Sequence, residues 1–413
     1  MASSQIAFMP DTRVARARLH EGELSGLTFA AKDSFAIRGH VSSAGVPDWA
    51  RTHGPAERTA QVVEQLLGAG ADLVGVTILD ELAFGLSGIN PHYGTPQNPR
   101  AMGRLCGGSS CGSAAAVAGA LCDFALGTDT AGSVRVPAAF CGLFGIRPTH
   151  GAISAEGVVP LAPSFDTVGF LTRDAHTFDS VAALLFDGST AGPGVHGAHA
   201  ETRASTQRNV ERVLIAEDAL GLCDAGVPEL LRHLVDRAVR GLGARAEVIE
   251  VAPEGFAALS AAFARLRARE IWHAHGAWVR TAQPHLSPAV QARFEQACEQ
   301  SERDGDDRVA RDQALRERLR ERLRHLLEPG TLLFIPAVPG VAPLLDASAA
   351  ELETFRLHAL ELSSIASLAG VPQLVVPARE LDGAPVALSF ISAAHSDAWL
   401  SQLAAPLDRA LEG

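Results

Sequence analysis

The sequence predicts an α/β fold, because short apolar runs alternate with amphipathic helical segments near its beginning and again near its end. The chain has 413 residues, of which 47% are hydrophobic and 20% are charged. This length and composition are sufficient for a large buried core. We expect one domain over residues 1–413. Its three parts are a core at about 25–180, a connector and helical region at about 186–327, and a C-terminal α/β return at about 330–413.

The first strand–helix–strand unit lies between residues 27 and 77. LTFAAKD (27–33) reads as a short buried strand that ends at Lys32. Residues 59–69 carry apolar side chains at helical spacing, and Gly70 follows as a stop signal. ADLVGVT (71–77) then reads as a second buried strand.

A segment rich in glycine and serine follows, and it contains most of the residues that suggest chemistry. Prolines and paired glycines make residues 86–112 a loop, and a helix is expected from about Ser113. The strand DFALGTD (123–129) leads into a tight turn at 130–132 and a helix from Ser133.

The rest of the chain is expected to be mostly helical before the α/β pattern returns. The expected connector is 186–208, and the expected elements are helices at 227–241, 257–280, 301–327, 348–369 and 397–411 with strands in TLLFIPAVPG, QLVVPA and PVALSFIS. The helix at 301–327 is highly charged, so we expect it to be solvated, with only a leucine stripe facing inward. The stripe comprises Leu315, Leu319, Leu323 and Leu326.

The overall charge excludes several classes of function. The formal net charge is −12, and no local run is strongly basic, which argues against binding to nucleic acid or to a membrane surface. No signal pattern or spanning apolar run is present, so we expect a cytoplasmic protein. The six cysteines form no CxxC pair, and the fifteen histidines lack metal-ligand spacing. We therefore expect neither a metal nor an organic cofactor.

Lys32 is the only lysine among 35 basic residues. One lysine remaining by chance is the simple interpretation. The alternative is that arginine cannot function at position 32, since a desolvated lysine can lose its proton and act as a base whereas arginine stays charged.

Two Gly/Ser segments supply a candidate nucleophile. GTDTAGS (127–133) leads from a strand into a helix, where successive backbone N–H groups and the helix dipole favour an oxyanion. Ser133 at this turn is a candidate nucleophile, although a helix-capping serine is the common alternative. A serine needs a base, and neither segment contains a histidine; Lys32 is the candidate instead.

Taken together, these motifs resemble the amidase signature family. That family has an early lysine, a Gly-Gly-Ser-Ser segment and a Gly-Ser nucleophile turn 24 residues after the first serine of that segment. Ser133 follows Ser109 by this spacing. DELAFG (80–85), NPHYGTPQNP (90–99) and RPTHG (147–151) also agree with the family. The resemblance covers the chain from about residue 25 and implies a large mixed β-sheet between two layers of helices.

The resemblance also implies a mechanism and a set of site residues. Neutral Lys32 takes a proton from Ser109, which takes one from Ser133, and Ser133 attacks the amide carbonyl to form an acyl-enzyme. The Gly108–Ser109 peptide is expected to be cis, and Asp129 and Arg135 are expected to form a buried pair that braces the turn. The implied oxyanion hole comprises the N–H groups of Thr130, Ala131, Gly132 and Ser133, and the implied substrate contacts are Phe84, Gly85 and Ser110. Ala131 departs from the family's usual glycine, which predicts an altered oxyanion turn.

Three functional hypotheses follow. Within the family, the text GVPDWARTH (45–53) and CGLFGIRPTHGAIS (141–154) is similar to plant-type indole-3-acetamide hydrolases. This implies a small primary amide with an aromatic or apolar acyl group, cleaved to an acid and ammonia; an acyl-enzyme accepts esters too. The alternatives are the glutaminase subunit of a tRNA-dependent amidotransferase and a non-catalytic scaffold on the same fold. The expected partner is a small amide substrate, and the sequence does not decide whether the protein forms a homodimer.

Overall fold

The fold is organised around one mixed ten-stranded sheet. The computed structural model describes residues 6–10, 12, 14–186, 209–303 and 305–412 of the chain. The strand order is β2-β1-β3-β5-β4-β9-β10-β8-β6-β7. The strands are β1 (Thr28–Lys32), β2 (Asp72–Thr77), β3 (Phe124–Asp129), β4 (Phe144–Arg147), β5 (Thr167–Thr172), β6 (Arg212–Ala216), β7 (Arg245–Ile249), β8 (Thr331–Phe334), β9 (Gln373–Leu381) and β10 (Ala384–Ile391).

Parallel pairing occurs at both ends of this sheet and antiparallel pairing in its middle. β1 lies parallel to β2 and β3, and β6 lies parallel to β7 and β8. The pairs from β3 through β5, β4, β9 and β10 to β8 are antiparallel. The predicted α/β fold with a mixed sheet and covering helices is therefore confirmed.

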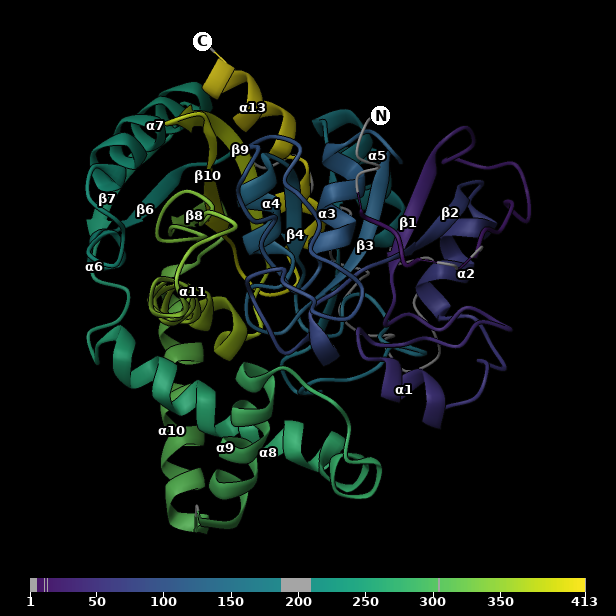
Figure 1. Cartoon of the computed structure of the whole chain (residues 1–413). Coiled ribbons are helices and arrows are strands. Elements are labelled where there is room, and N and C mark those ends of the chain that lie inside the picture. The colour runs from purple at the N-terminus through teal and green to yellow at the C-terminus, as the bar shows by residue number, and fades with distance from the viewer. Residues whose placement is uncertain (1–5, 11, 13, 187–208, 304, 413) are drawn as a thin grey trace.

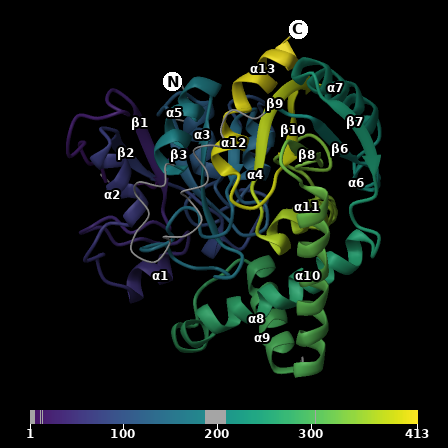
Figure 2. The same cartoon turned by 180° about the vertical axis from the view of Figure 1, so that it is seen from behind.

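Helices cover both faces of the sheet. α3 and α4 lie on the face turned towards the viewer in Figure 1, whereas α5, α12 and α13 lie on the face seen in Figure 2. The helices are α1 (Pro47–Thr52), α2 (Gln61–Gly68), η1 (Glu81–Ala83), α3 (Cys111–Ala118), α4 (Arg135–Cys141), α5 (Ala175–Phe186), α6 (Glu217–Leu220), α7 (Val227–Leu242), α8 (Phe256–Ala282), α9 (Pro288–Arg303), α10 (Asp306–Leu326), α11 (Ala349–Ala369), α12 (Asp397–Ser401) and α13 (Ala404–Glu412).

The predicted elements around the site form where their sequence patterns placed them. β1 ends at Lys32, as expected for the run LTFAAKD. The apolar side chains of α2 are all buried, and Gly70 beyond its end takes the left-handed φ of +99°. α11 begins with a capping box between Ser348 and Glu351, in which each side chain accepts a hydrogen bond from the backbone N–H of the other residue.

Two predicted helices are wrong in their extent. The single charged helix expected at 301–327 spans the end of α9 and all of α10, because Gly305 has extended backbone angles and is the N-cap of α10. The inward leucine stripe is confirmed, with Leu319 and Leu323 buried. The expected helix at 397–411 is two helices, since the chain turns at Gln402 and thereby lets α13 pack on α7 and β9.

The long helices α8, α9 and α10 form a separate layer beyond one edge of the core. They extend below the sheet in Figure 1 and pack on one another and on α11. Most of the predicted connector 186–208 lies outside the described residues. In the described part of the chain, no helix is long and apolar enough to cross a lipid bilayer.

Candidate active site

Lys32 lies at the end of β1, completely buried in the core. Its Nζ donates hydrogen bonds to Ser109 Oγ and to Thr128 Oγ1, each at 2.7 Å. Burial lowers the pKa of Lys32 to about 8, although the carboxylate of Asp80 opposes part of this effect. A large fraction of the lysine is therefore neutral near pH 8, and neutral lysine is the form that can accept a proton.

The predicted relay serine lies directly on this lysine. Ser109 is fully buried and follows the Gly108–Ser109 peptide, which is cis as expected. The next N–H along the chain, that of Ser110, donates to the carbonyl oxygen of Ser133 at 3.2 Å. The three predicted catalytic residues are thus brought into one region from segments up to 101 positions apart in the sequence.

Ser133 lies in the turn between β3 and α4 and lines a small cavity, here called the inner pocket. The inner pocket has a free volume of about 20 Å³, which is room for about one water molecule. Its lining comprises Ala83, Phe84, Gly85, Leu86, Thr130, Ala131, Ser133, Leu161, Arg267, Arg293, Arg356 and Leu360. Phe84 and Gly85, both predicted to contact substrate, are in this set. Ser110 is fully buried and donates instead to the Thr128 carbonyl at 3.4 Å, so its substrate contact stays a prediction.

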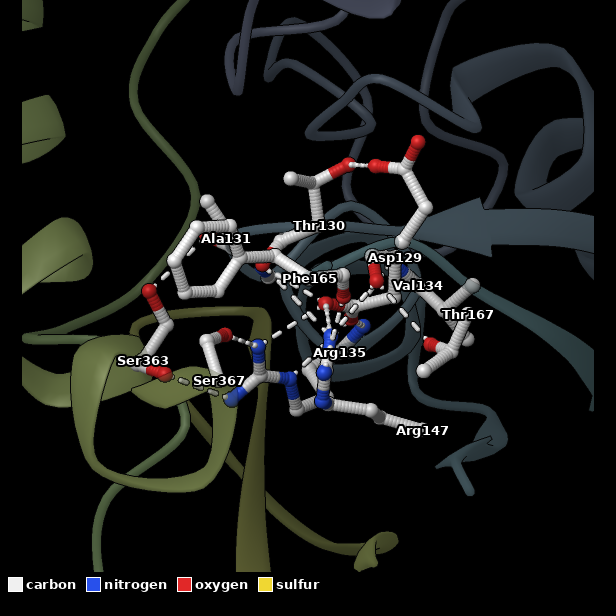
Figure 3. A network of polar contacts seen from close by, with 12 residues as sticks. Asp129, Thr130, Ala131, Val134, Arg135, Arg147, Phe165, Thr167, Ser363 and Ser367 are labelled. Carbon is white, nitrogen blue, oxygen red and sulfur yellow. Dashed lines mark hydrogen bonds and ion pairs between the residues drawn. The ribbon is translucent and has the colours of Figure 1, made fainter. Parts of the chain in front are cut away.

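The nucleophile turn is held by the carboxylate of Asp129, at the centre of Figure 3. This carboxylate accepts hydrogen bonds from the N–H groups of Gly132 at 2.8 Å and Val134 at 3.1 Å. It also pairs with Arg135 at 2.8 Å and with Arg147 at 3.3 Å. The predicted buried pair of Asp129 and Arg135 is confirmed, and Arg147 is an additional member that the sequence did not suggest.

The charged groups of Asp129, Arg135 and Arg147 are buried away from water, so each charge is stabilised mainly by the opposite charges beside it. Burial alone would raise the pKa of the Asp129 carboxyl, but the two guanidinium groups outweigh burial and hold that pKa well below its usual range. Arg135 also donates to the Ser363 carbonyl and the Ser367 hydroxyl of α11, as Figure 3 shows. The turn is thereby connected to α11, which carries part of the inner pocket.

The backbone of the turn shows why alanine is accepted at position 131. Ala131 does not have a left-handed backbone, whereas Gly132 has a φ of +110°. The family's first glycine is therefore not needed for the backbone conformation at this position, and an effect of Ala131 on the oxyanion turn stays a prediction. The Gly132 N–H donates to Asp129, while those of Thr130, Ala131 and Ser133 donate to no backbone carbonyl among the described residues.

We expect Gly132→Ala to reduce turnover far more than Ala131→Gly. A β-carbon at position 132 would lie 3.2 Å from Val136 Cγ2. The alanine would also have to adopt a positive φ, at a cost of about 1–3 kcal/mol. If that strain displaces the oxyanion donors, kcat should fall about tenfold or more. The measurement is kcat for both variants on one amide substrate. Equal losses in the two variants would contradict this assignment of the strained position.

Two neighbours of Lys32 were missed by the sequence analysis. Thr128 accepts the second hydrogen bond of Lys32, and only its position near the end of β3 could have suggested this role. Asp80 is buried against the backbones of Gly85 and Gly108, and it accepts the Gly88 N–H at 3.2 Å. Burial raises the pKa of Asp80 to about 6, and its Oδ1 has no hydrogen-bond partner among the described residues. Its place in the DELAFG motif was the available signal.

The pKa of Lys32 predicts the pH dependence of activity. Only the neutral lysine accepts a proton, so kcat/KM for an uncharged amide should rise with pH and level off above about 8. At pH 6 the value should be about 100-fold below the plateau, since the neutral fraction falls tenfold per pH unit. A rate profile from pH 5.5 to 9.5, with circular dichroism at each pH as the folding control, checks this. A flat profile over that range would exclude Lys32 as the base.

Comparisons with known proteins agree with this geometry. The family model described as Amidase matches residues 2–400. The chain is 38% identical to Amidase 1 of Arabidopsis thaliana over 92% of each chain. It is 31% identical to an indoleacetamide hydrolase of Pseudomonas syringae pv. syringae, over 94% of this chain and 86% of the relative.

Relatives named for another role and a solved structure are also similar. A protein of Pisum sativum named translocon at the outer membrane of chloroplasts 64 is 35% identical, over 91% of this chain and 65% of its own length. A crystal structure of an amidase is 29% identical and superposes with a TM-score of 0.79, over 94% of this chain and 86% of that one. From the matched family model, the identities and the shared fold, we conclude that this chain belongs to the amidase signature family.

Proposed function

We propose that this protein hydrolyses a small carboxylic amide to the acid and ammonia through an acyl-enzyme on Ser133. The observation that carries the proposal is the buried Lys32, whose Nζ lies 2.7 Å from Ser109 Oγ and whose pKa is lowered to about 8. A scaffold has no need for a desolvated lysine on a serine hydroxyl, since burying a lysine is costly. A primary amide with an aromatic or apolar acyl group is the proposed substrate, supported by the similarity to an indoleacetamide hydrolase.

The proposed reaction begins with proton transfer towards Lys32. Neutral Nζ takes the proton of Ser109 Oγ while Ser109 takes that of Ser133, and Ser133 Oγ bonds to the amide carbon. The carbonyl oxygen gains the negative charge, and the N–H groups of Thr130, Ala131 and Ser133 stabilise it. Gly132, predicted as a fourth donor, contributes instead by tying the turn to Asp129.

Collapse of this intermediate breaks the C–N bond. The proton held on Lys32 returns through Ser109 to the leaving nitrogen, and ammonia departs. Water then attacks the acyl carbon and gives its proton to the same relay, which releases the acid and restores Ser133. Each cycle therefore consumes one amide and one water and leaves the proton balance of the site unchanged.

The test is ammonia release from a small panel of amides, with Ser133→Ala as the matched control. The panel contains indole-3-acetamide, phenylacetamide, a short aliphatic amide and glutamine. Turnover of the arylacetamides that is absent in Ser133→Ala would support the proposal. Release from glutamine alone would favour the amidotransferase glutaminase subunit. Silence across the panel from folded protein would exclude these substrates and would favour a substrate of other chemistry, a missing partner or a scaffold.

A further inference from the structure

A second, larger cavity opens from the inner pocket between α8, α9 and α11, and we call it the outer cavity. It has a volume of about 290 Å³. Both cavities are lined by Phe84, Arg267, Arg293, Arg356 and Leu360. Three arginine side chains are therefore common to the wall of the outer cavity and that of the inner pocket, which also holds the proposed nucleophile Ser133.

Arg267 on α8 is the most deeply placed of the three arginines. Its side chain is 8% exposed, and its Nε is buried without a hydrogen-bond partner among the described residues. The guanidinium lies over the ring of Phe263 at 5.0 Å, and no ion pair of Arg267 is found in the described part of the chain. Burial, together with the nearby charges of Arg356 and Arg293, lowers the pKa of Arg267 to about 9, although the carboxylate of Asp166 opposes part of this effect.

The other two arginines add positive charge to this site, and of these two only Arg356 has an ion-pair partner among the described residues. Arg293 on α9 donates to the Phe84 carbonyl at 2.6 Å, which leaves its charge uncompensated at that contact. Arg356 on α11 pairs with Glu353, whose side chain is half exposed. Glu361 is the only carboxylate in the lining of the outer cavity. The described lining thus holds three arginines and one carboxylate, and Glu353, which lies outside the lining, compensates the charge of Arg356.

Such a site favours an anion. A buried charge without a partner is unfavourable, and a carboxylate can accept two parallel hydrogen bonds from one guanidinium. Arginine is the side chain best suited to bind a carboxylate in this way. The inner pocket has room for about one water molecule, so the acyl part of a bound amide must extend towards the arginines.

We infer that the substrate is an amide whose acyl group carries a carboxylate at its far end, as in the monoamide of a dicarboxylic acid. The amide carbonyl lies at Ser133 and the carboxylate lies among Arg267, Arg293 and Arg356. The inference rests on the proposed function and narrows its substrate class. Glutamine fits less well than glutaramate, because its ammonium group would be placed near three guanidinium groups.

Matched substrate pairs test the inference. The first pair is phenylacetamide and (4-carboxyphenyl)acetamide, and the second is glutamine and glutaramate. We expect (4-carboxyphenyl)acetamide in the first pair and glutaramate in the second to have at least a tenfold higher kcat/KM than the other member, mainly through a lower KM. In Arg267→Gln and Arg356→Gln the preference within the first pair should fall at least tenfold. Arg280→Gln, an exposed arginine on the same helix, should keep the preference of the wild type.

A binding measurement separates this inference from the proposed function. Calorimetric titration of glutarate, the product of glutaramate hydrolysis, should give binding to the wild type that Arg267→Gln weakens at least tenfold. If glutarate binds in this way while no amide is turned over, the proposed hydrolysis fails and the anion site stands. If phenylacetamide has the same kcat/KM as its carboxylated partner, or if glutarate does not bind, the inference is overturned.

Discussion

Replacing Lys32 by arginine is expected to lower amide turnover by about 100- to 10,000-fold, the usual contribution of a general base. Arginine keeps the positive charge but cannot release its proton near neutral pH, so the first proton transfer has no acceptor. The effect should appear in kcat, because Lys32 is buried and is absent from the linings of both cavities. Steady-state ammonia release from one neutral amide measures it.

A second variant keeps this test decisive if the larger arginine disturbs packing. Lys32→Met has a similar length and no charge, and it removes the base from a site where burial already disfavours charge. It should fold as the wild type does by circular dichroism and be equally inactive. Retention of more than a tenth of the activity by folded Lys32→Met would exclude lysine as the base.

Replacing Asp129 by asparagine is expected to destabilise the protein by about 3–5 kcal/mol, the range seen when one partner of a buried ion pair is removed. The change leaves Arg135 and Arg147 buried with no countercharge, since both pair with this carboxylate. It also weakens the acceptor that holds the Gly132 N–H, so kcat should fall together with stability. Denaturant unfolding and ammonia release measure the two effects.

Glu302→Gln is the matched control for this carboxylate-to-amide change. Its partner Arg280 lies 3.0 Å away, and both side chains are more than half exposed. Exposed ion pairs contribute about 0–1 kcal/mol, so Glu302→Gln should be close to the wild type in stability and turnover. Should Asp129→Asn behave like this control, the buried network would not be what holds the nucleophile turn.

The sequence predicted the local elements well, because apolar spacing is read over a few neighbouring residues. β1 ends at Lys32 as the run LTFAAKD indicated, and the turn before α4 lies where the small residues placed it. The errors arose where a break depends on context. Gly305 begins a new helix, and the turn at Gln402 is set by the surfaces on which α12 and α13 pack.

The sequence by itself was also sufficient to identify the family, the candidate catalytic residues and Lys32 as the single lysine. Motif spacing and residue chemistry can be read directly from the order of residues. Only the tertiary structure decided what surrounds them. Thr128 and Asp80 became neighbours of Lys32 through strand pairing and close glycine packing, which no local pattern specifies. Arg267, Arg293 and Arg356 come from three helices and appear unrelated along the chain. Their meeting beside Ser133 depends on how α8, α9 and α11 pack, because charge accumulates at a site through long-range contacts and not through sequence proximity.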